Sequence, residues 1–283
     1  MARLQGAFVL PADLAYTQGR YGFHNREKTM SVFDAFGLQG QVAIVTGAGA
    51  GIGRAIAELF AAAGAAVVVG DLQQASAEAL AGELLAAGHR ACAQACDVTR
   101  AADREALVEA ALAHFGRIDL LVNNAGGGGP KPFDMPLETF VKAFELNVFS
   151  VFHLAQLCVP HMERAGGGAI LNISSMAGEN KNVQMAAYAA SKAAENHLTR
   201  NIAFDLGPRG IRVNAIAPGA IRTAALAKVL SAETERAMLR HTPLGRLGEG
   251  RDIAYAALFL CSPAAAWISG QVLTVSGGGQ QEL

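Results

Sequence analysis

The sequence has little charge. Only 17% of its 283 residues are Asp, Glu, Lys or Arg, and the formal net charge is −1. This balance gives no electrostatic reason to expect binding to nucleic acid or to anionic lipid. Aromatic residues are also scarce, whereas 52% of the residues are hydrophobic and 32 are glycine. The composition therefore predicts a globular protein with a large core of small apolar side chains.

Patterns typical of metal sites and membrane spans are lacking too. The four cysteines do not have the spacing of a zinc site or of a disulfide framework, and free cysteines are usually buried. The seven histidines show no metal spacing either, so we expect no bound metal. No uninterrupted apolar run reaches about 18 residues. We therefore expect a cytoplasmic protein with no membrane partner.

Residues 1–34 differ from the rest of the chain. They show little periodicity and lack the uninterrupted apolar stretch of a signal peptide. We expect a poorly ordered tail here, followed by a single dinucleotide-binding catalytic domain over residues 35–283.

From residue 40 onward, short apolar runs alternate with helical patterns. Runs that are apolar on both faces are typical of buried parallel strands. This alternation predicts an α/β protein of the single-domain Rossmann fold, a doubly wound seven-stranded parallel sheet with helices on both faces. Residues from about 222 to 248 look helical and amphipathic, and we expect a substrate lid there, before the last strand. The predicted strands are 42–45, 66–69, 91–95, 120–122, 169–173, 211–216 and 272–275.

The first predicted strand leads into a glycine-rich turn, Thr46-Gly-Ala-Gly-Ala-Gly-Ile-Gly53. Gly47 permits the tight turn, Gly51 lets the backbone approach a pyrophosphate, and Gly53 lets the next helix pack close to the strand. Asp71 ends the second strand about 20 residues later, where a carboxylate binds the adenosine ribose and repels a 2′-phosphate. These features predict NAD rather than NADP as the cofactor.

A second group of residues has the chemistry of proton transfer. Tyr188 and Lys192 are four residues apart in a helical stretch, so their side chains share one face of that helix. Ser175 follows a strand thirteen residues before Tyr188. Ser174 is the alternative serine, although its side chain would point to the opposite side of the strand end. Asn147 lies within another helical stretch.

The glycine-rich turn, Asn123-Asn-Ala-Gly126, Ser175 and Tyr188-x-x-x-Lys192 together resemble the classical short-chain dehydrogenases/reductases. The resemblance covers about residues 38 to 283. It implies that Tyr188 is the general base, that Lys192 stabilises its phenolate, and that Ser175 holds the reacting oxygen.

The same resemblance implies further roles. Asn147 would hold a water that connects the catalytic lysine to solvent, and helices near 137–164 and 186–206 would pack between the subunits of a homotetramer. Asp97 would lie at the adenine edge, although a plain turn role for it stays open. The residues implied in cofactor binding are Gly47, Gly51, Ile52, Gly53, Asp71, Leu72, Asp97, Val98, Asn124, Tyr188, Lys192, Ile221, Arg222 and Thr223.

Some segments narrow the resemblance to the bacterial 7α-hydroxysteroid dehydrogenases, which oxidise the 7α-hydroxyl of bile acids. They include residues 123–136, 179–182 and 275–283. The alternative is a 3-oxoacyl thioester reductase or another secondary-alcohol dehydrogenase of the same family. The thioester reductases generally use NADPH, which Asp71 disfavours. A non-catalytic nucleotide-binding scaffold is a third interpretation. The presence of the family's whole catalytic tetrad, Asn147, Ser175, Tyr188 and Lys192, disfavours it. The residues implied in substrate binding are Gly128, Ser175, Asn180 and Tyr188.

Overall fold

The computed structural model describes residues 32–181, 183–227 and 230–279. Most of the predicted tail, residues 1–31, therefore lies outside the described residues. Its last three residues, 32–34, belong to a short 3-10 helix, η1 (Val32–Phe36), which precedes the first strand.

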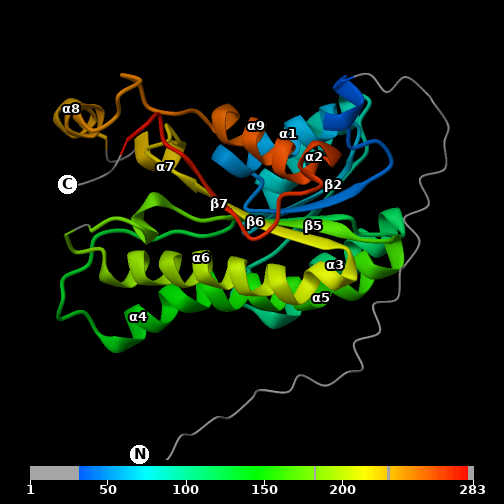
Figure 1. The fold of residues 1–283 in the computed structure, drawn as a ribbon, viewed down its shortest axis with the longest axis horizontal. Helices are drawn as coiled ribbons and strands as arrows, with labels where there is room; N and C mark the ends of the chain where they lie inside the picture. The colour runs from blue at the N-terminus through cyan, green and yellow to red at the C-terminus, as the bar shows by residue number, and fades with distance from the viewer. Residues whose placement is uncertain (1–31, 182, 228–229, 280–283) are drawn as a thin grey trace, which may run out of the picture.

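Seven parallel strands form one sheet in the order β3-β2-β1-β4-β5-β6-β7. This arrangement, shown in Figure 1, confirms the predicted doubly wound sheet, because the strand order reverses direction after β1. The strands extend the predicted runs by no more than two residues at either end. They are β1 (Val42–Thr46), β2 (Ala66–Asp71), β3 (Ala91–Ala95), β4 (Leu120–Asn123), β5 (Gly168–Ile173), β6 (Ile211–Pro218) and β7 (Val272–Val275).

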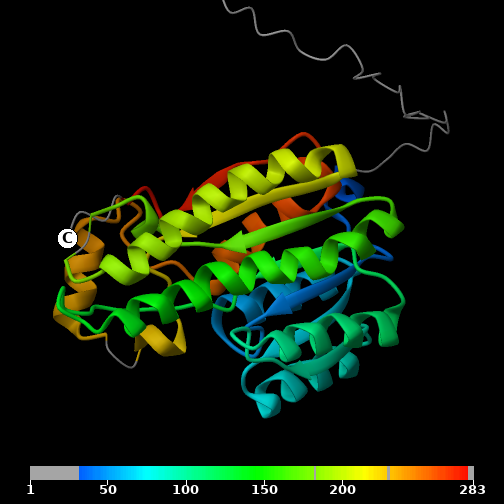
Figure 2. The ribbon, with the colours of Figure 1, turned by 90° about the horizontal axis from the view of Figure 1, so that it is seen from below.

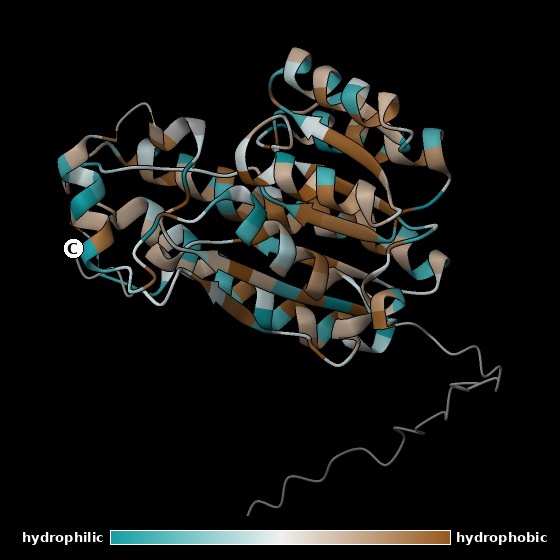
Figure 3. Cartoon of the chain, turned by 90° about the horizontal axis from the view of Figure 1, so that it is seen from above, coloured by the Kyte–Doolittle hydropathy of each residue, from teal (hydrophilic) through white to brown (hydrophobic). Residues whose placement is uncertain are grey.

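Helices cover both faces of the sheet (Figures 1 and 2). One face carries α1 (Gly51–Ala62), α2 (Gln74–Ala86) and α9 (Gly250–Cys261), which share one apolar core. The other face carries α3 (Ala101–Phe115), α5 (Ser150–Ala165) and α6 (Ala186–Leu206), which share a second. Figure 3 shows the apolar strands between these two layers. The sheet is thus buried on both sides, which explains why its strands lack polar alternation.

The remaining helices are short. They are α4 (Leu137–Phe144), the π-helical turn η2 (Glu145–Phe149), η3 (Met176–Gly178), η4 (Gly207–Arg209), α7 (Ala224–Ala227), α8 (Ala232–Arg240) and η5 (Pro263–Ala265). Helices α7 and α8 lie between β6 and α9, in the segment for which the sequence predicts a substrate lid, and we call this pair of helices the lid. Figure 1 shows α7 and α8 at the end of the molecule that the carboxyl ends of the strands approach.

One helical stretch bears on the prediction that no segment spans a membrane. Residues Leu137–Ala165 form a helix of 29 residues that is long and apolar enough to cross a membrane, with a hydropathy of 1.2 in its most apolar window. Its buried side packs on the sheet through residues such as Leu154, Cys158 and Met162, as a core helix does. Only 39% of that window is buried, so much of its apolar surface faces outward.

Candidate active site

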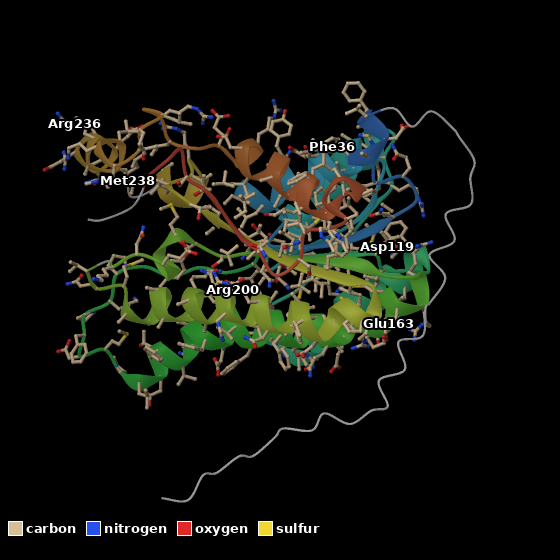
Figure 4. All side chains as sticks on the ribbon, viewed as in Figure 1. Phe36, Asp119, Glu163, Arg200, Arg236 and Met238 are labelled. Carbon is tan, nitrogen blue, oxygen red and sulfur yellow. The ribbon has the colours of Figure 1, made fainter. Side chains whose placement is uncertain are left out.

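Loops that follow β1, β4, β5 and β6 meet around a cleft of about 700 Å³ at the carboxyl ends of the strands. Ligands of doubly wound sheets bind at this edge, where the strand order reverses. Leu226 and Met238 of the lid also line the cleft, and Figure 4 shows Met238 on α8. The predicted site residues that line it are Gly47, Gly51, Ile52, Asn124, Gly128, Ser175, Tyr188, Lys192, Ile221 and Thr223.

The glycine-rich turn has the geometry of an anion site. Gly47 and Gly51 have positive φ angles of 61° and 58°, which favour glycine. A Cβ on Gly53 would lie 2.3 Å from the carbonyl oxygen of Gly47, so only glycine lets α1 pack this close to β1. Ala50 gives α1 no side-chain cap, which leaves amide groups of the first helical turn for a phosphate.

Asp71 braces this turn from the end of β2. Its Oδ2 accepts a hydrogen bond from the Gly49 amide at 2.8 Å, and its Oδ1 accepts one from the Gln73 amide at 2.9 Å. Carboxylate oxygens accept more than one hydrogen bond, so both can still bind ribose hydroxyls. Asp71 and the exposed Leu72 lie outside the cleft lining, beside the turn.

Asp97 behaves as a turn residue. Its Oδ1 accepts hydrogen bonds from the amide and hydroxyl of Thr99, and these bonds lower the pKa of Asp97. Val98 is buried next to it. The structure does not bring either residue into the cleft lining, so an adenine contact at this point stays a prediction.

Asn124 ties β4 to the glycine-rich turn. Its Nδ2 donates to the carbonyl oxygens of Thr46 and Gly47 at 2.8 and 3.1 Å. The Thr46 hydroxyl in turn accepts hydrogen bonds from the amides of Asn124 and Ala125. The side-chain amide of Asn124 is thus occupied in holding the cofactor-binding turn in shape.

Ser175 and Ser174 have different surroundings. Ser175 caps η3, where its Oγ accepts a hydrogen bond from the Ala177 amide at 3.1 Å. Its own O–H therefore remains available to an oxygen in the cleft. Ser174 is buried, and its hydroxyl donates to the carbonyl oxygen of Lys192 at 3.3 Å. The geometry favours Ser175 as the serine that contacts substrate.

Two hydrogen bonds fix the side chain of Lys192. Its Nζ donates to the carbonyl oxygen of Ile173 at 2.9 Å and to Oε2 of Glu195 at 2.7 Å. A lysine ammonium has three hydrogens, so one remains for the cleft. Glu195 was not identified from the sequence, although its i+3 spacing from Lys192 and its opposite charge were a usable signal.

Asn147 lies between the glycine loop and α6. It lies in the π-helical turn η2, fully buried, and its Nδ2 donates to the carbonyl oxygen of Gly127 and to Oγ of Ser191, each at 3.0 Å. Its Oδ1 accepts a hydrogen bond from the Gly127 amide, also at 3.0 Å. Both amide hydrogens are therefore used in fixing the glycine loop to α6, and a water held by Asn147 near Lys192 stays a prediction.

The glycine run Gly126–Gly129 is a close-packed wall. A Cβ on Gly126 would lie 2.8 Å from Oδ1 of Asn147 and 3.3 Å from Nζ of Lys192. A Cβ on Gly128 would lie 2.4 Å from Cδ2 of Tyr188. Gly127 and Gly129 have open space around the corresponding position. Gly126 and Gly128 therefore have no room for a side chain, because Asn147, Lys192 and Tyr188 pack directly against them.

Three other predicted residues surround the lid and the substrate side. Arg222 forms an ion pair with Glu235 of α8 at 2.5 Å, which directs it away from the cleft. Thr223 lies over Gly51, where a Cβ would be 3.4 Å from its Cγ2, and its Oγ1 accepts a hydrogen bond from the Leu226 amide. Asn180 lies outside the cleft lining, and its buried Nδ2 has no partner among the described residues.

A nucleotide-binding turn and a Ser175–Tyr188–Lys192 group at one cleft define a dinucleotide-dependent dehydrogenase. The family model described as enoyl-(acyl carrier protein) reductase matches residues 47–280. The chain belongs to the short-chain dehydrogenase/reductase family.

Individual relatives show the same relationship. The 7α-hydroxysteroid dehydrogenase of Escherichia coli K12 is 60% identical over 250 residues, which cover 88% of this chain and 98% of the relative. A solved structure of a 7α-hydroxysteroid dehydrogenase complexed with NADH and 7-oxo glycochenodeoxycholic acid matches with a TM-score of 0.88 and 59% identity, covering 90% of this chain and 100% of that one. The 3-oxoacyl-[acyl-carrier-protein] reductase of Vibrio cholerae is 40% identical over 242 residues, which cover 85% of this chain and 98% of the relative.

Proposed function

We propose that this chain is an NAD-dependent 7α-hydroxysteroid dehydrogenase that oxidises the 7α-hydroxyl of bile acids such as cholate to the 7-keto product. The observation that carries the proposal is the 59% identity, over the whole matched chain, to a protein solved with NADH and a 7-oxo bile acid. The cleft supports it, because Ser175, Tyr188 and Lys192 all line it.

The described residues fit NAD. The uncapped first turn of α1 suits a pyrophosphate, and the glycine at position 53 keeps that helix against β1. The Asp71 carboxylate, fixed on Gly49, suits ribose hydroxyls and repels a 2′-phosphate. Ile221 and Thr223 border the cleft opposite Gly51, where the remaining phosphate and carboxamide contacts would fall.

The chain's own residues handle the proton. Tyr188, as the phenolate, accepts the proton of the substrate hydroxyl while the hydride leaves the carbon that carries that hydroxyl. The free O–H of Ser175 donates to the same oxygen and keeps it against Tyr188. The Lys192 ammonium stabilises the phenolate by its positive charge. When bound, NAD supplies the hydride acceptor in its nicotinamide ring.

The substrate would lie between the glycine wall and the lid. A bile acid is a large, rigid and mainly apolar ligand, and such ligands need an apolar cleft with few polar anchors. Leu226 and Met238 supply apolar lid surface. Asn180 lies outside the cleft lining, so its contact with the steroid rests on the resemblance alone. Gly128 carries no side chain, so the Tyr188 ring can pack against this part of the cleft lining.

We further propose a cytoplasmic homotetramer. A closed homotetramer built as a dimer of dimers needs two different self-complementary surfaces. On the α4–α6 side, Phe149, Phe152 and Phe204 are exposed, and Figure 2 shows α5 and α6 side by side. At the β7 edge of the sheet, Trp267 and Leu273 are exposed. Burial of the first surface would account for the apolar outer side of the Leu137–Ala165 helix.

The assembly is tested with Phe204→Glu. Phe204 is 87% exposed, so the change leaves the monomer fold intact and places a charge in the proposed interface. Light scattering after gel filtration should give dimers in place of tetramers, whereas exposed Glu109→Gln on α3 should leave the mass unchanged. A wild-type monomer, or a tetrameric Phe204→Glu variant, contradicts this arrangement.

The activity is tested by NADH formation from cholate and NAD with the purified protein. The 7β-hydroxy epimer serves as the matched control substrate, and NADP as the control cofactor. We expect turnover of the 7α-hydroxyl with NAD only. Turnover of 3-oxoacyl thioesters with NADPH, without oxidation of any 7α-hydroxy bile acid, would replace the proposal by the reductase alternative.

A further inference from the structure

Glu195 lies behind the candidate active site, on the face of α6 that carries Lys192. The two side chains form an ion pair of 2.7 Å and are only 1% and 4% exposed. Burying a charged pair carries a desolvation cost, so an ion pair of this kind is weak evidence for a purely stabilising role. The proton transfer assigned to Ser175, Tyr188 and Lys192 makes no use of this carboxylate.

Lys192 is the charged group that acts on Glu195. Burial raises the pKa of Glu195 to about 7, and Lys192 opposes this rise through its charge and its hydrogen bond. Oε1 of Glu195 has no partner among the described residues. The carboxylate therefore faces the lysine alone.

Other ionisable groups on α6 and on the elements packed against it are turned away. Arg212 of β6 donates to the main-chain carbonyls of Leu260, Cys261 and Ser262. The segments of β5 and η3 contain no ionisable residue. The exposed groups are Glu138 and Lys142 of α4, Glu145 of η2, Arg209 of η4, and His197, Arg200 and Asp205 of α6 itself; Figure 4 marks Arg200.

The ion pair has two consequences for the catalytic lysine. First, the carbonyl of Ile173 and the carboxylate of Glu195 together fix two of its three ammonium hydrogens, which directs the third toward the cleft. Second, a negative charge 2.7 Å from Nζ offsets part of the positive potential that Lys192 exerts on Tyr188.

We propose that Glu195 is a positioning residue of the dehydrogenase reaction, which fixes Lys192 and offsets its charge, and thereby sets the pH at which Tyr188 becomes an effective base. The inference rests on the proposed function, because it requires Tyr188 and Lys192 to act in hydride transfer. Without the carboxylate, the lysine favours the phenolate more strongly, so Tyr188 works at lower pH.

The test compares pH profiles of kcat/KM at saturating NAD. In Glu195→Gln, which keeps the shape of the side chain without its charge, we expect the acidic limb to move to lower pH by about one unit. Glu195→Ala introduces a smaller side chain that clashes with no neighbour, and it should move the acidic limb in the same direction. Glu195→Asp keeps the charge and should stay close to the wild type, as should the exposed control Glu109→Gln.

The outcomes are distinct. An acidic limb at the wild-type pH in Glu195→Gln and Glu195→Ala, even with a uniformly lower kcat, means that Glu195 is structural and overturns the proposal. A shift to higher pH overturns it as well. The profiles are recorded with whichever secondary alcohol the wild type oxidises, so a wrong substrate assignment does not alter this test.

Discussion

The contact between Gly128 and Tyr188 makes a strong prediction about catalysis. A Cβ on Gly128 would lie 2.4 Å from Cδ2 and 2.8 Å from Cγ of the tyrosine ring, whereas ordinary contacts are 3.4–4 Å. In Gly128→Ala the ring must therefore move by about 1 Å, and a misplacement of that size costs about 100-fold in rate. We expect kcat for the bile acid to fall by this factor.

Gly129→Ala is the matched control, because a Cβ there has nothing within 4 Å. Neither glycine has a positive φ angle, so alanine fits the backbone at both positions. Steady-state kinetics with saturating NAD gives kcat, a binding titration gives the Kd for NAD, and thermal unfolding checks the fold. Wild-type kcat in Gly128→Ala, or equal losses in both variants, would refute the close approach of this wall to the catalytic ring.

Two further predictions concern the tyrosine and the buried carboxylate. Tyr188→Phe removes the proton acceptor and should lower kcat by about 1,000-fold, with NAD affinity retained. If the protein is a nucleotide-binding scaffold, the wild type and the variant should bind NAD equally and neither should oxidise the substrate. Burial raises the pKa of Glu195 from 4.5 to about 7, so the folded state binds the proton of this carboxyl more tightly than the unfolded state does. The protonated side chain therefore stabilises the fold at a pH below 4.5, and this contribution is lost as the pH rises through 7. Urea unfolding should show the wild type losing stability relative to Glu195→Gln as pH rises across this window. Asp252, whose pKa is lowered to about 2 by its hydrogen bond with Arg246, titrates outside it; equal pH slopes in both proteins would contradict the burial effect.

The sheet and the glycine-rich turn could be predicted from the sequence because local patterns determine them. Seven apolar runs became seven strands, since a strand covered on both faces has no polar alternation to obscure it. The turn from Gly47 to Gly53 follows from glycine positions within a few residues of each other. The i, i+4 spacing of Tyr188 and Lys192 likewise places both at one cleft.

The contacts around the tetrad could not be predicted in the same way, because they join distant segments. Asn147 holds Gly127, twenty residues away, through both its donor and its acceptor. Spacing alone gives no indication of that partner. The resemblance predicts Arg222 at the cofactor, and sequence position gives no sign of its ion pair with Glu235 of the lid. A resemblance to a family predicts which residue occupies a position. The hydrogen-bond partners of that residue depend on how this chain packs.

The surroundings of Tyr188 suggest that its position and its charge are controlled from separate sides. The glycine wall contacts the ring by shape alone, since Gly128 has no polar side chain to offer. Lys192 and Glu195 act from the α6 side by charge, and the lysine is already fixed on the Ile173 carbonyl. A change in the wall should therefore lower kcat equally at every pH, whereas a change at Glu195 should move the profile along the pH axis. If the ring position and its ionisation were set by one shared contact, no single substitution could alter one without the other; the separation of these two groups of residues is what makes them independently adjustable.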